Sequence, residues 1–279
     1  MPAKALTHAI DRLSPTLAAA ITYPTYVGGG KRRAVHERER ATHEEARRTR
    51  MHIGGRRIIV YEWGTGPRTV LLVHGWRGRA SQFASIVREL RSAGFRVVSF
   101  DAPASGDSQG RRTHMGEFQR VISVLARREP TGRFPLVVAH SAGTLAALVA
   151  AADRGITGRI VAISPVVRFS YLGEAFARMA GLGNAARLRH EGWFAARLRR
   201  EGVDAGPYDL LARDLPPHLH VDVVHDTDDP LSDVTESRRF AARHPGQVRL
   251  VETVGLGHSH ILRADVTLDT VLAVAERGA

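Results

Sequence analysis

The serine of the segment Ala139-His140-Ser141-Ala142-Gly143 is the residue best suited to nucleophilic chemistry. The segment follows a short apolar run and opens a stretch rich in Ala and Leu, which predicts a strand, a tight turn and a helix. A serine in such a turn projects its hydroxyl above the sheet, and small residues two positions before and after it let strand and helix approach closely. Ala139 stands where glycine is usual, which adds one methyl group. We therefore predict Ser141 as a nucleophile.

Two later segments combine histidine with carboxylates, which a serine nucleophile requires. A serine hydroxyl is weak without an adjacent base, and the base needs a carboxylate to orient it. His225-Asp226-Thr227-Asp228-Asp229-Pro230 ends an apolar run, and Gly255-Leu256-Gly257-His258-Ser259-His260 precedes the last helical stretch. We predict Asp229 as the carboxylate and His258 as the base, in the chain order Ser, Asp, His.

Other residues of these two segments offer alternatives. Asp228 and Asp226 compete for the role of the carboxylate, and His260 competes for that of the base, although we expect His260 to cap the following helix instead. A metal site is a further interpretation, with the ligands His218, His220, His225, Asp228 and His258. Their spacing matches no common metal motif, so we predict no metal.

The segment His74-Gly75-Trp76-Arg77-Gly78 follows an earlier apolar run and is expected to supply an oxyanion donor. A tetrahedral oxyanion needs two backbone N–H groups, one from the residue after the nucleophile and one from the loop after an upstream strand. Here these groups belong to Ala142 and Trp76. Residues 101–108 are expected to support the floor of the site, because Asp101 precedes the serine and so has the wrong chain order for the catalytic acid.

The elements that must position these residues alternate along the chain. Apolar and β-branched runs predict strands at 57–62, 69–74, 96–100, 135–140, 159–164, 219–225 and 248–253. Between them, helical periodicity predicts helices at 81–93, 114–127, 142–153, 233–243 and 261–275. This alternation predicts an α/β fold with a mostly parallel central sheet flanked by helices.

Two regions depart from this alternation. Residues 1–50 are predicted as an N-terminal helical extension, with a surface-packed helix that ends near Tyr23-Pro24 and a charged, solvated helix over 31–50. The alternative for the first helix is a loose association with a membrane, and the alternative for 31–50 is an arm that binds an anionic partner. Residues 51–279 form the main domain. Within it, residues 167–217 hold no strand signal and are rich in Arg and aromatic residues, so we predict a small helical cap there.

The substrate pocket is expected between the cap and the loops that carry the nucleophile. The predicted substrate-binding residues are Trp76, His140, Phe169, Trp193 and Phe194. For the aromatic residues, packing within the helical core is an equally valid interpretation. The many Arg residues of the cap favour either an anionic substrate or a solvated helical face.

Composition limits the classes of protein to consider. The chain has 279 residues, no Cys and a formal net charge of +12, but only two of its basic residues are Lys. Because no nucleic-acid-binding motif accompanies the scattered Arg residues, no specific nucleic-acid partner is predicted. The absence of Cys excludes disulfides and thiolate metal sites. No signal peptide or transmembrane segment is evident, so we expect a cytoplasmic protein.

With these motifs in order, the chain resembles the α/β-hydrolase superfamily over residues 56–277. Five segments carry the resemblance. They are Gly64-Thr65-Gly66-Pro67, Leu71-Leu72-Val73-His74-Gly75-Trp76, Gly78-Arg79-Ala80-Ser81-Gln82-Phe83, Asp101-Ala102-Pro103 and Gly255-Leu256-Gly257-His258. They are similar to a little-characterised bacterial subgroup of predicted serine hydrolases. Besides Ala139, Ser105 departs from the family pattern, because many members carry His in that loop.

The resemblance implies a reaction and a set of partners. Ser141 would attack an acyl carbonyl, His258 would take its proton and Asp229 would orient His258, with no cofactor. The implied substrate is a small-molecule carboxylic ester, although the fold also hosts acyl transfer and perhydrolysis. The alternative is a non-catalytic ligand-binding or interaction protein on the same fold. The oligomeric state stays open.

Overall fold

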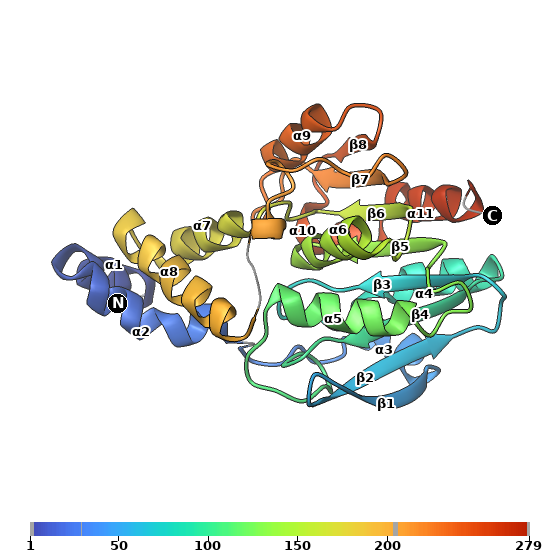
Figure 1. Ribbon diagram of the computed structural model, residues 1–279, viewed down its shortest axis with the longest axis horizontal. Helices are drawn as coiled ribbons and strands as arrows, with labels where there is room; N and C mark the ends of the chain where they lie inside the picture. Colours follow the sequence, from blue (N-terminus) through green and yellow to red (C-terminus); the bar gives the residue numbers. More distant parts are fainter. Residues whose placement is uncertain (1–2, 29, 203–205, 278–279) are drawn as a thin grey trace.

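A single eight-stranded sheet forms the centre of the computed structural model, which describes residues 3–28, 30–202 and 206–277 (Figure 1). Its strand order is β1-β2-β4-β3-β5-β6-β7-β8. Strands β1 and β2 pair antiparallel, and β2 is also antiparallel to β4, whereas all later pairs are parallel. The strands are β1 (Arg47–Ile53), β2 (Arg56–Trp63), β3 (Thr69–Val73), β4 (Arg96–Asp101), β5 (Leu136–His140), β6 (Arg159–Ile163), β7 (His220–Asp226) and β8 (Val248–Thr253). The predicted α/β class is confirmed.

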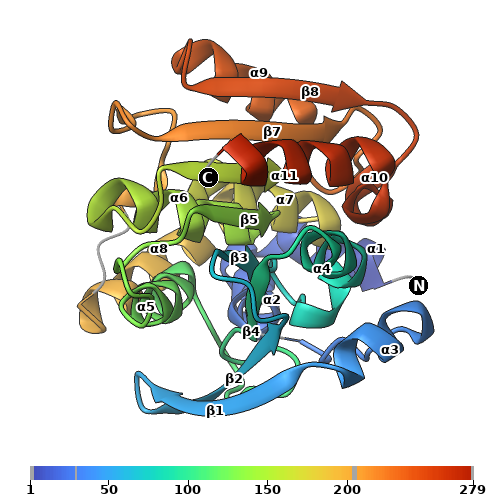
Figure 2. The same cartoon turned by 90° about the vertical axis from the view of Figure 1, so that its right-hand side faces the viewer.

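Helices cover both faces of this sheet, which explains why the central strands contain apolar residues at consecutive positions. In β3, Leu71 and Val73 pack on one face, and Val70 and Leu72 pack on the other. Helices α5 (Met115–Ala126) and α6 (Ala142–Arg154) cover the first face. The second face is covered by α4 (Ala84–Ser92) and α11 (Asp265–Arg277), as Figure 2 shows. Helix α9 (Val234–Arg243) packs on β7 and β8.

The charged segment before β2 differs from the prediction of one solvated helix over 31–50. A short helix, α3 (Glu37–Glu44), is followed by strand β1, which begins at Arg47 and pairs with β2. Only Ile53 of β1 is buried. An edge strand with one exposed face can carry Arg at most positions, so its sequence shows no apolar alternation that would distinguish it from a solvated helix.

The N-terminal segment folds as two helices, α1 (Ala3–Leu13) and α2 (Pro15–Val27). Ser14 accepts a hydrogen bond from the backbone N–H of Leu17 and so caps α2. Contrary to the prediction, α2 does not end near Pro24 but continues to Val27. Val27 is buried beside Phe194 of a later helix, and this packing outweighs the hydrogen bond that Pro24 cannot donate.

Residues 167–217 contain helices α7 (Phe169–Ala180) and α8 (Asn184–Arg200). Helix α2 packs on α8 and α1 on α7, so the four helices form one unit at the end of the sheet towards which the parallel strands point (Figure 1). We call α1, α2, α7 and α8 the helical unit. The predicted domain boundary at residue 50 falls inside β1. Residues 1–2, 203–205 and 278–279 of the predicted domains and cap lie outside the described residues. Within the described ranges, no helix has the length and apolar character needed to cross a membrane.

Candidate active site

Ser141 occupies a strained turn between β5 and α6. Its φ of 55° and ψ of −130° place a non-glycine residue in a rarely populated region, and such strain is typical of functional sites. The turn is held by hydrogen bonds from the Ser141 N–H to the carbonyl of Ile163 (2.9 Å) and from the Val166 N–H to the Ser141 carbonyl (3.2 Å). The Ser141 Oγ makes no hydrogen bond to any residue in the described part of the chain. Within the described part of the chain, no hydrogen bond therefore ties this hydroxyl to another role.

Two glycines let neighbouring backbone approach this turn. A Cβ at Gly143 would lie 2.4 Å from the carbonyl oxygen of His74, so only glycine lets α6 pack this closely on the end of β3. A Cβ at Gly75 would lie 2.8 Å from Ser141 Cβ and 3.3 Å from Ser141 Oγ. The loop after β3 therefore lies directly against the side chain of Ser141.

His74 fixes the shape of this loop. Its Nε2 accepts the N–H of Ala102 (2.9 Å), which leaves Nδ1–H to donate to the carbonyl of Gly75 (2.7 Å). Asp101 is fully buried and accepts hydrogen bonds from the Ala80 N–H and the Tyr61 hydroxyl. With its oxygens engaged in this way, Asp101 supports the loops under the site rather than facing the nucleophile.

His258 and Asp229 are in direct contact. The Nδ1 of His258 lies 2.7 Å from Asp229 Oδ2, and the Asp229 side chain has no exposed surface. The other oxygen, Oδ1, accepts the backbone N–H groups of Leu231 (2.9 Å) and Ser232 (3.0 Å). A carboxylate only accepts hydrogen bonds, so His258 donates from Nδ1 and its Nε2 remains available as a base.

The surroundings of Asp229 keep it ionised. Burial by itself would raise the pKa of Asp229, but the imidazoles of His225 and His258 and the N–H of Ser232 outweigh it and hold the pKa well below its usual range. His225 Nε2 lies 3.6 Å from Asp229 Oδ2 and is anchored to the carbonyl of Ser232 (2.9 Å). Two histidines therefore flank one buried carboxylate.

The alternative carboxylates have other environments. Asp228 is exposed. Asp226 is buried and accepts hydrogen bonds from Thr253 Oγ1 (2.7 Å) and the Leu256 N–H (2.9 Å). It therefore ties the loop after β7 to the loop after β8. The predicted cap role of His260 is wrong, because His260 is exposed and its side chain makes no cap hydrogen bond.

The five candidate metal ligands are not brought together. Both ring nitrogens of His225 are engaged, by Ser237 Oγ and the carbonyl of Ser232, and His220 and Asp228 are exposed. Across residues 3–28, 30–202 and 206–277, no cluster of three or more His, Asp or Glu side chains is arranged to hold a metal ion.

His140, the residue before the nucleophile, lies beside the base His258. Its Nε2–H donates to the backbone carbonyl of His258 (2.9 Å), and the two rings lie 4.7 Å apart. Burial, with a contribution from the neighbouring His258, lowers the pKa of His140 to about 3, so His140 is neutral at pH 7. The residue that precedes Ser141 thus anchors the backbone that carries His258.

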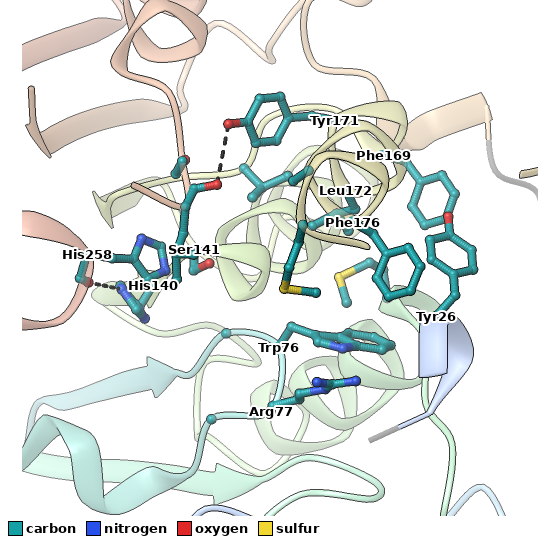
Figure 3. A pocket seen from close by; sticks show the side chains of 18 of the residues that line it. Tyr26, Trp76, Arg77, His140, Ser141, Phe169, Tyr171, Leu172, Phe176 and His258 are labelled. Carbon is teal, nitrogen blue, oxygen red and sulfur yellow. Dashed lines mark hydrogen bonds between the residues drawn. The ribbon is translucent and has the colours of Figure 1, made fainter. Parts of the chain in front are cut away.

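A cavity of about 690 Å³ opens above Ser141 and extends towards the helical unit (Figure 3). Ser141, His140 and His258 lie at one end, and Tyr26, Phe169 and Phe176 lie at the other (Figure 3). Trp76 and Arg77 lie along one wall between these ends. The lining is mostly apolar and aromatic, which suits an acyl chain or another apolar group.

Four of the five predicted substrate-binding residues line this cavity: Trp76, His140, Phe169 and Phe194. The prediction for Trp193 is wrong. Its indole packs edge-on against Tyr23 with ring centroids 5.4 Å apart, and 36% of the residue is exposed. Phe194, the next residue, stacks on Phe169 instead (5.2 Å). Adjacent helical residues point about 100° apart, and here Phe194 faces the cavity while Trp193 packs against Tyr23.

Sequence analysis missed the contribution of the N-terminal segment. Thr25 and Tyr26 of α2 and Arg33 line the cavity, although they precede Ser141 by more than a hundred residues. No local pattern could have shown this, because it depends on how α2 packs on α8. The other residues of α7 could have been found, since Leu172, Phe176 and Met179 recur with the predicted Phe169 at helical spacing and all line the cavity.

Both predicted oxyanion donors lie near the nucleophile. Ala142 follows Ser141 in the chain, and Trp76 belongs to the loop that contacts Ser141. Ala142 is the first residue of α6, so its N–H has no carbonyl partner within the helix. Trp76 follows Gly75, whose Cα faces Ser141. A helix N-terminus also favours negative charge. The arrangement can therefore receive an anionic oxygen beside Ser141.

Known proteins resemble this chain in sequence and in fold. Residues 70–270 match the pattern of the "Alpha/beta hydrolase family". A monoacylglycerol lipase of Mycolicibacterium smegmatis is 30% identical over 102 residues, which are 33% of this chain and 36% of the lipase. The match thus spans about a third of that relative's length.

Two solved structures share the fold at lower identity. An esterase from Pyrococcus furiosus superimposes with a TM-score of 0.64 at 19% identity, covering 88% of this chain and 98% of the esterase. A bacterial membrane phospholipase A superimposes with a TM-score of 0.63 at 16% identity, covering 98% of this chain and 96% of the other. At these identities the likeness concerns the fold alone.

Proposed function

Because the chain belongs to the alpha/beta hydrolase family, we propose that it is a serine hydrolase that cleaves carboxylic esters. The observation that carries the proposal is the combination of Ser141 in its strained turn with the 2.7 Å contact between His258 and Asp229 on one cavity. The relatives named above, a monoacylglycerol lipase and an esterase, act on substrates of this class by their names and so support an ester.

The proposed reaction begins with attack on the acyl carbonyl. His258 Nε2 takes the proton of the Ser141 hydroxyl while Ser141 Oγ bonds to the carbonyl carbon. The tetrahedral oxyanion would be stabilised by the N–H groups of Trp76 and Ala142. Protonated His258 then gives its proton to the leaving alcohol, and an acyl-enzyme remains. Water, deprotonated by His258, releases the acid and restores Ser141.

The environment of Asp229 suits its proposed part in this cycle. A carboxylate that stays ionised stabilises the imidazolium that forms when His258 takes the proton of Ser141. Its two backbone hydrogen bonds fix its position, so His258 is held in the tautomer with Nδ1–H. His140, through the carbonyl of His258, is proposed to hold the backbone of the base in place.

The cavity supports an apolar acyl or alcohol group of medium length. Its far end is closed by aromatic rings from two helices, Tyr26 of α2 and Phe169 and Phe176 of α7. We therefore expect the turnover of soluble p-nitrophenyl esters to rise with acyl chain length until the chain reaches these rings, and to fall beyond it.

Covalent labelling tests the proposal directly. A fluorophosphonate probe should label the wild-type protein once, and Ser141→Ala should abolish both labelling and ester turnover. The matched control is Ser259→Ala, which removes a second serine hydroxyl from the same cavity and should leave labelling intact. A wild-type protein that is neither labelled nor active on any ester would overturn the proposal and favour a non-catalytic binding protein.

A further inference from the structure

The large apolar residues that remain exposed are concentrated in the helical unit. Among the described residues, all but Leu231 and Val254 belong to α1, α2, α7 or α8, and each except Trp193 is more than half exposed. They are Leu6, Leu13, Leu17, Ile21, Met179, Leu188 and Trp193. Leu13 is exposed over 88% of its surface. A gathering of this kind marks a contact surface rather than a solvated face.

Helix α2 is the clearest part of this surface. Its sequence, PTLAAAITYPTYV, contains no charged residue. One side is buried through Ala18, Ala19 and Val27 against the protein. The other side exposes Leu17, Ala20, Ile21 and Pro24, which recur at helical spacing. A soluble helix normally places charged residues on its exposed side, so α2 needs an apolar neighbour on both sides.

The same helices carry an excess of positive charge. Together α1, α2, α7 and α8 contain eight Lys and Arg residues and three Asp and Glu residues. Lys4 and Arg12 flank the exposed leucines of α1, and Arg189 follows the exposed Leu188 of α8. Apolar residues beside Lys and Arg on short helices are typical of segments that lie in the interface of an anionic membrane.

The apolar surface reaches the mouth of the cavity. Thr25 at the end of α2 and Met179 at the end of α7 are both exposed and both line the cavity. The turn after α7 rests on α1, since the carbonyl of Gly181 lies 3.3 Å from the His8 ring. The exposed ends of α2 and α7 therefore lie at the cavity above Ser141, and α1 contacts the turn after α7.

We propose that α1 and α2 dock the protein on an anionic lipid surface, with their exposed apolar residues in the headgroup region and the cavity mouth towards the acyl chains. The helices have 11 and 13 residues, too few to span a bilayer of about 20 helical residues. They therefore lie along the surface. The further statement that lipid esters reach Ser141 by this path rests on the proposed function, but docking itself does not.

Sedimentation with vesicles tests docking without any catalytic readout. The full-length protein is mixed with vesicles of phosphatidylcholine containing phosphatidylglycerol, and the bound fraction is measured. We expect the triple variant Leu13→Ser, Leu17→Ser, Ile21→Ser to lose about tenfold or more in affinity, because three apolar side chains no longer enter the interface. Val254→Ser removes an apolar side chain that is 75% exposed in the loop after β8; it is the control and should bind as the wild type does.

Four further measurements separate the possible outcomes. Ser141→Ala should bind vesicles normally, so a failed hydrolase assay does not affect this test. Vesicles of pure phosphatidylcholine should bind less protein, and added salt should weaken binding to the anionic vesicles. The triple variant should keep the thermal unfolding transition of the wild type, which shows that it is folded.

Either of two results would overturn the proposal. The first is equal vesicle binding by the wild type and the triple variant, or none by either. The second is a wild-type dimer in sedimentation equilibrium that the triple variant converts to a monomer without any vesicle binding, since this would show that a second copy of the chain covers the apolar face.

Discussion

The carboxylate of Asp229 contacts more groups than the single histidine that a catalytic triad requires. Its Oδ1 accepts two backbone N–H groups, and its Oδ2 faces His258 at 2.7 Å and His225 at 3.6 Å. The backbone donors hold the orientation of the carboxylate independently of His258. As a result, the side of Asp229 that meets the imidazole is fixed before any substrate binds.

This fixed orientation makes Asp229→Asn a sharp test. The amide oxygen should take the place of Oδ1, because two N–H donors point there, and the amide NH₂ then faces His258 Nδ1. His258 must accept at Nδ1 and carry its proton on Nε2, where it cannot act as a base. We expect kcat to fall about 10³- to 10⁴-fold while the protein stays folded, measured as ester turnover with a thermal unfolding check.

Asp228→Asn is the matched control, because it makes the same chemical change at the exposed neighbouring residue. It should leave kcat within about twofold. If Asp228→Asn were the damaging variant and Asp229→Asn were harmless, the assignment of the carboxylate would be wrong. The sequence favours Asp229 but leaves Asp228 and Asp226 open, and only the packing of the two loops distinguishes them.

At the scale of elements, the sheet was predictable because each of its central strands and most of its helices have a characteristic local sequence pattern. Continuous apolar runs identify β3 and β5, and the Ala- and Leu-rich stretch identifies α6. Strand β1 was missed because an Arg-rich edge strand has no buried pattern, and the end of α2 was missed because it depends on contacts with α8. Local sequence predicts elements well where their own residues form the core, and poorly where a distant element provides the contacts.

The packing of α6 on β3 gives a prediction at this scale. In Gly143→Ala, the new Cβ would lie 2.4 Å from the His74 carbonyl oxygen and 2.7 Å from that of Val73, and neither backbone atom can move without moving the strand. We expect the free energy of unfolding to fall by about 1–3 kcal/mol, together with a large loss of activity as Ser141 shifts. Urea unfolding and ester turnover measure the two effects.

Gly192→Ala provides the comparison within another helix, α8. A Cβ there would meet nothing within 4 Å, so the substitution should stabilise the protein by up to about 1 kcal/mol through helix propensity. The same substitution should therefore lower the free energy of unfolding at residue 143 and raise it at residue 192. A stabilising Gly143→Ala would show that α6 does not pack on β3 as described.

At the scale of the whole molecule, buried histidines link stability to pH. His43, His74, His114, His140 and His190 are all buried, and burial is the first cause that lowers the pKa of each. They come from the N-terminal segment, the β3 loop, the start of α5, the nucleophile turn and α8. A fall in pH should therefore destabilise both the helical unit and the sheet.

The sign of this effect follows from proton binding. In the unfolded chain these histidines titrate near pH 6.5, whereas in the folded protein they stay neutral to lower pH. Below about pH 6.5 the unfolded state binds more protons, so the free energy of unfolding decreases as pH falls. The stability should be fully present above pH 6.5 and should be lost as pH falls towards the folded pKa values. For His140, whose folded pKa is about 3, the loss at pH 5 is about 2 kcal/mol.

Urea unfolding at pH 8, 6.5, 5.5 and 5 measures this loss, with 0.5 M salt present to screen the repulsion caused by the net charge of +12. Between pH 6.5 and 5 most carboxylates stay ionised in both states, so the histidines dominate the slope. In His140→Gln the amide can still donate to the carbonyl of His258. The slope of the free energy of unfolding against pH should then correspond to about one proton fewer taken up on unfolding. A free energy of unfolding that stays constant or increases from pH 7 to 5 would show that these histidines take up protons in the folded state, and that burial in the sheet and the helical unit does not keep them neutral.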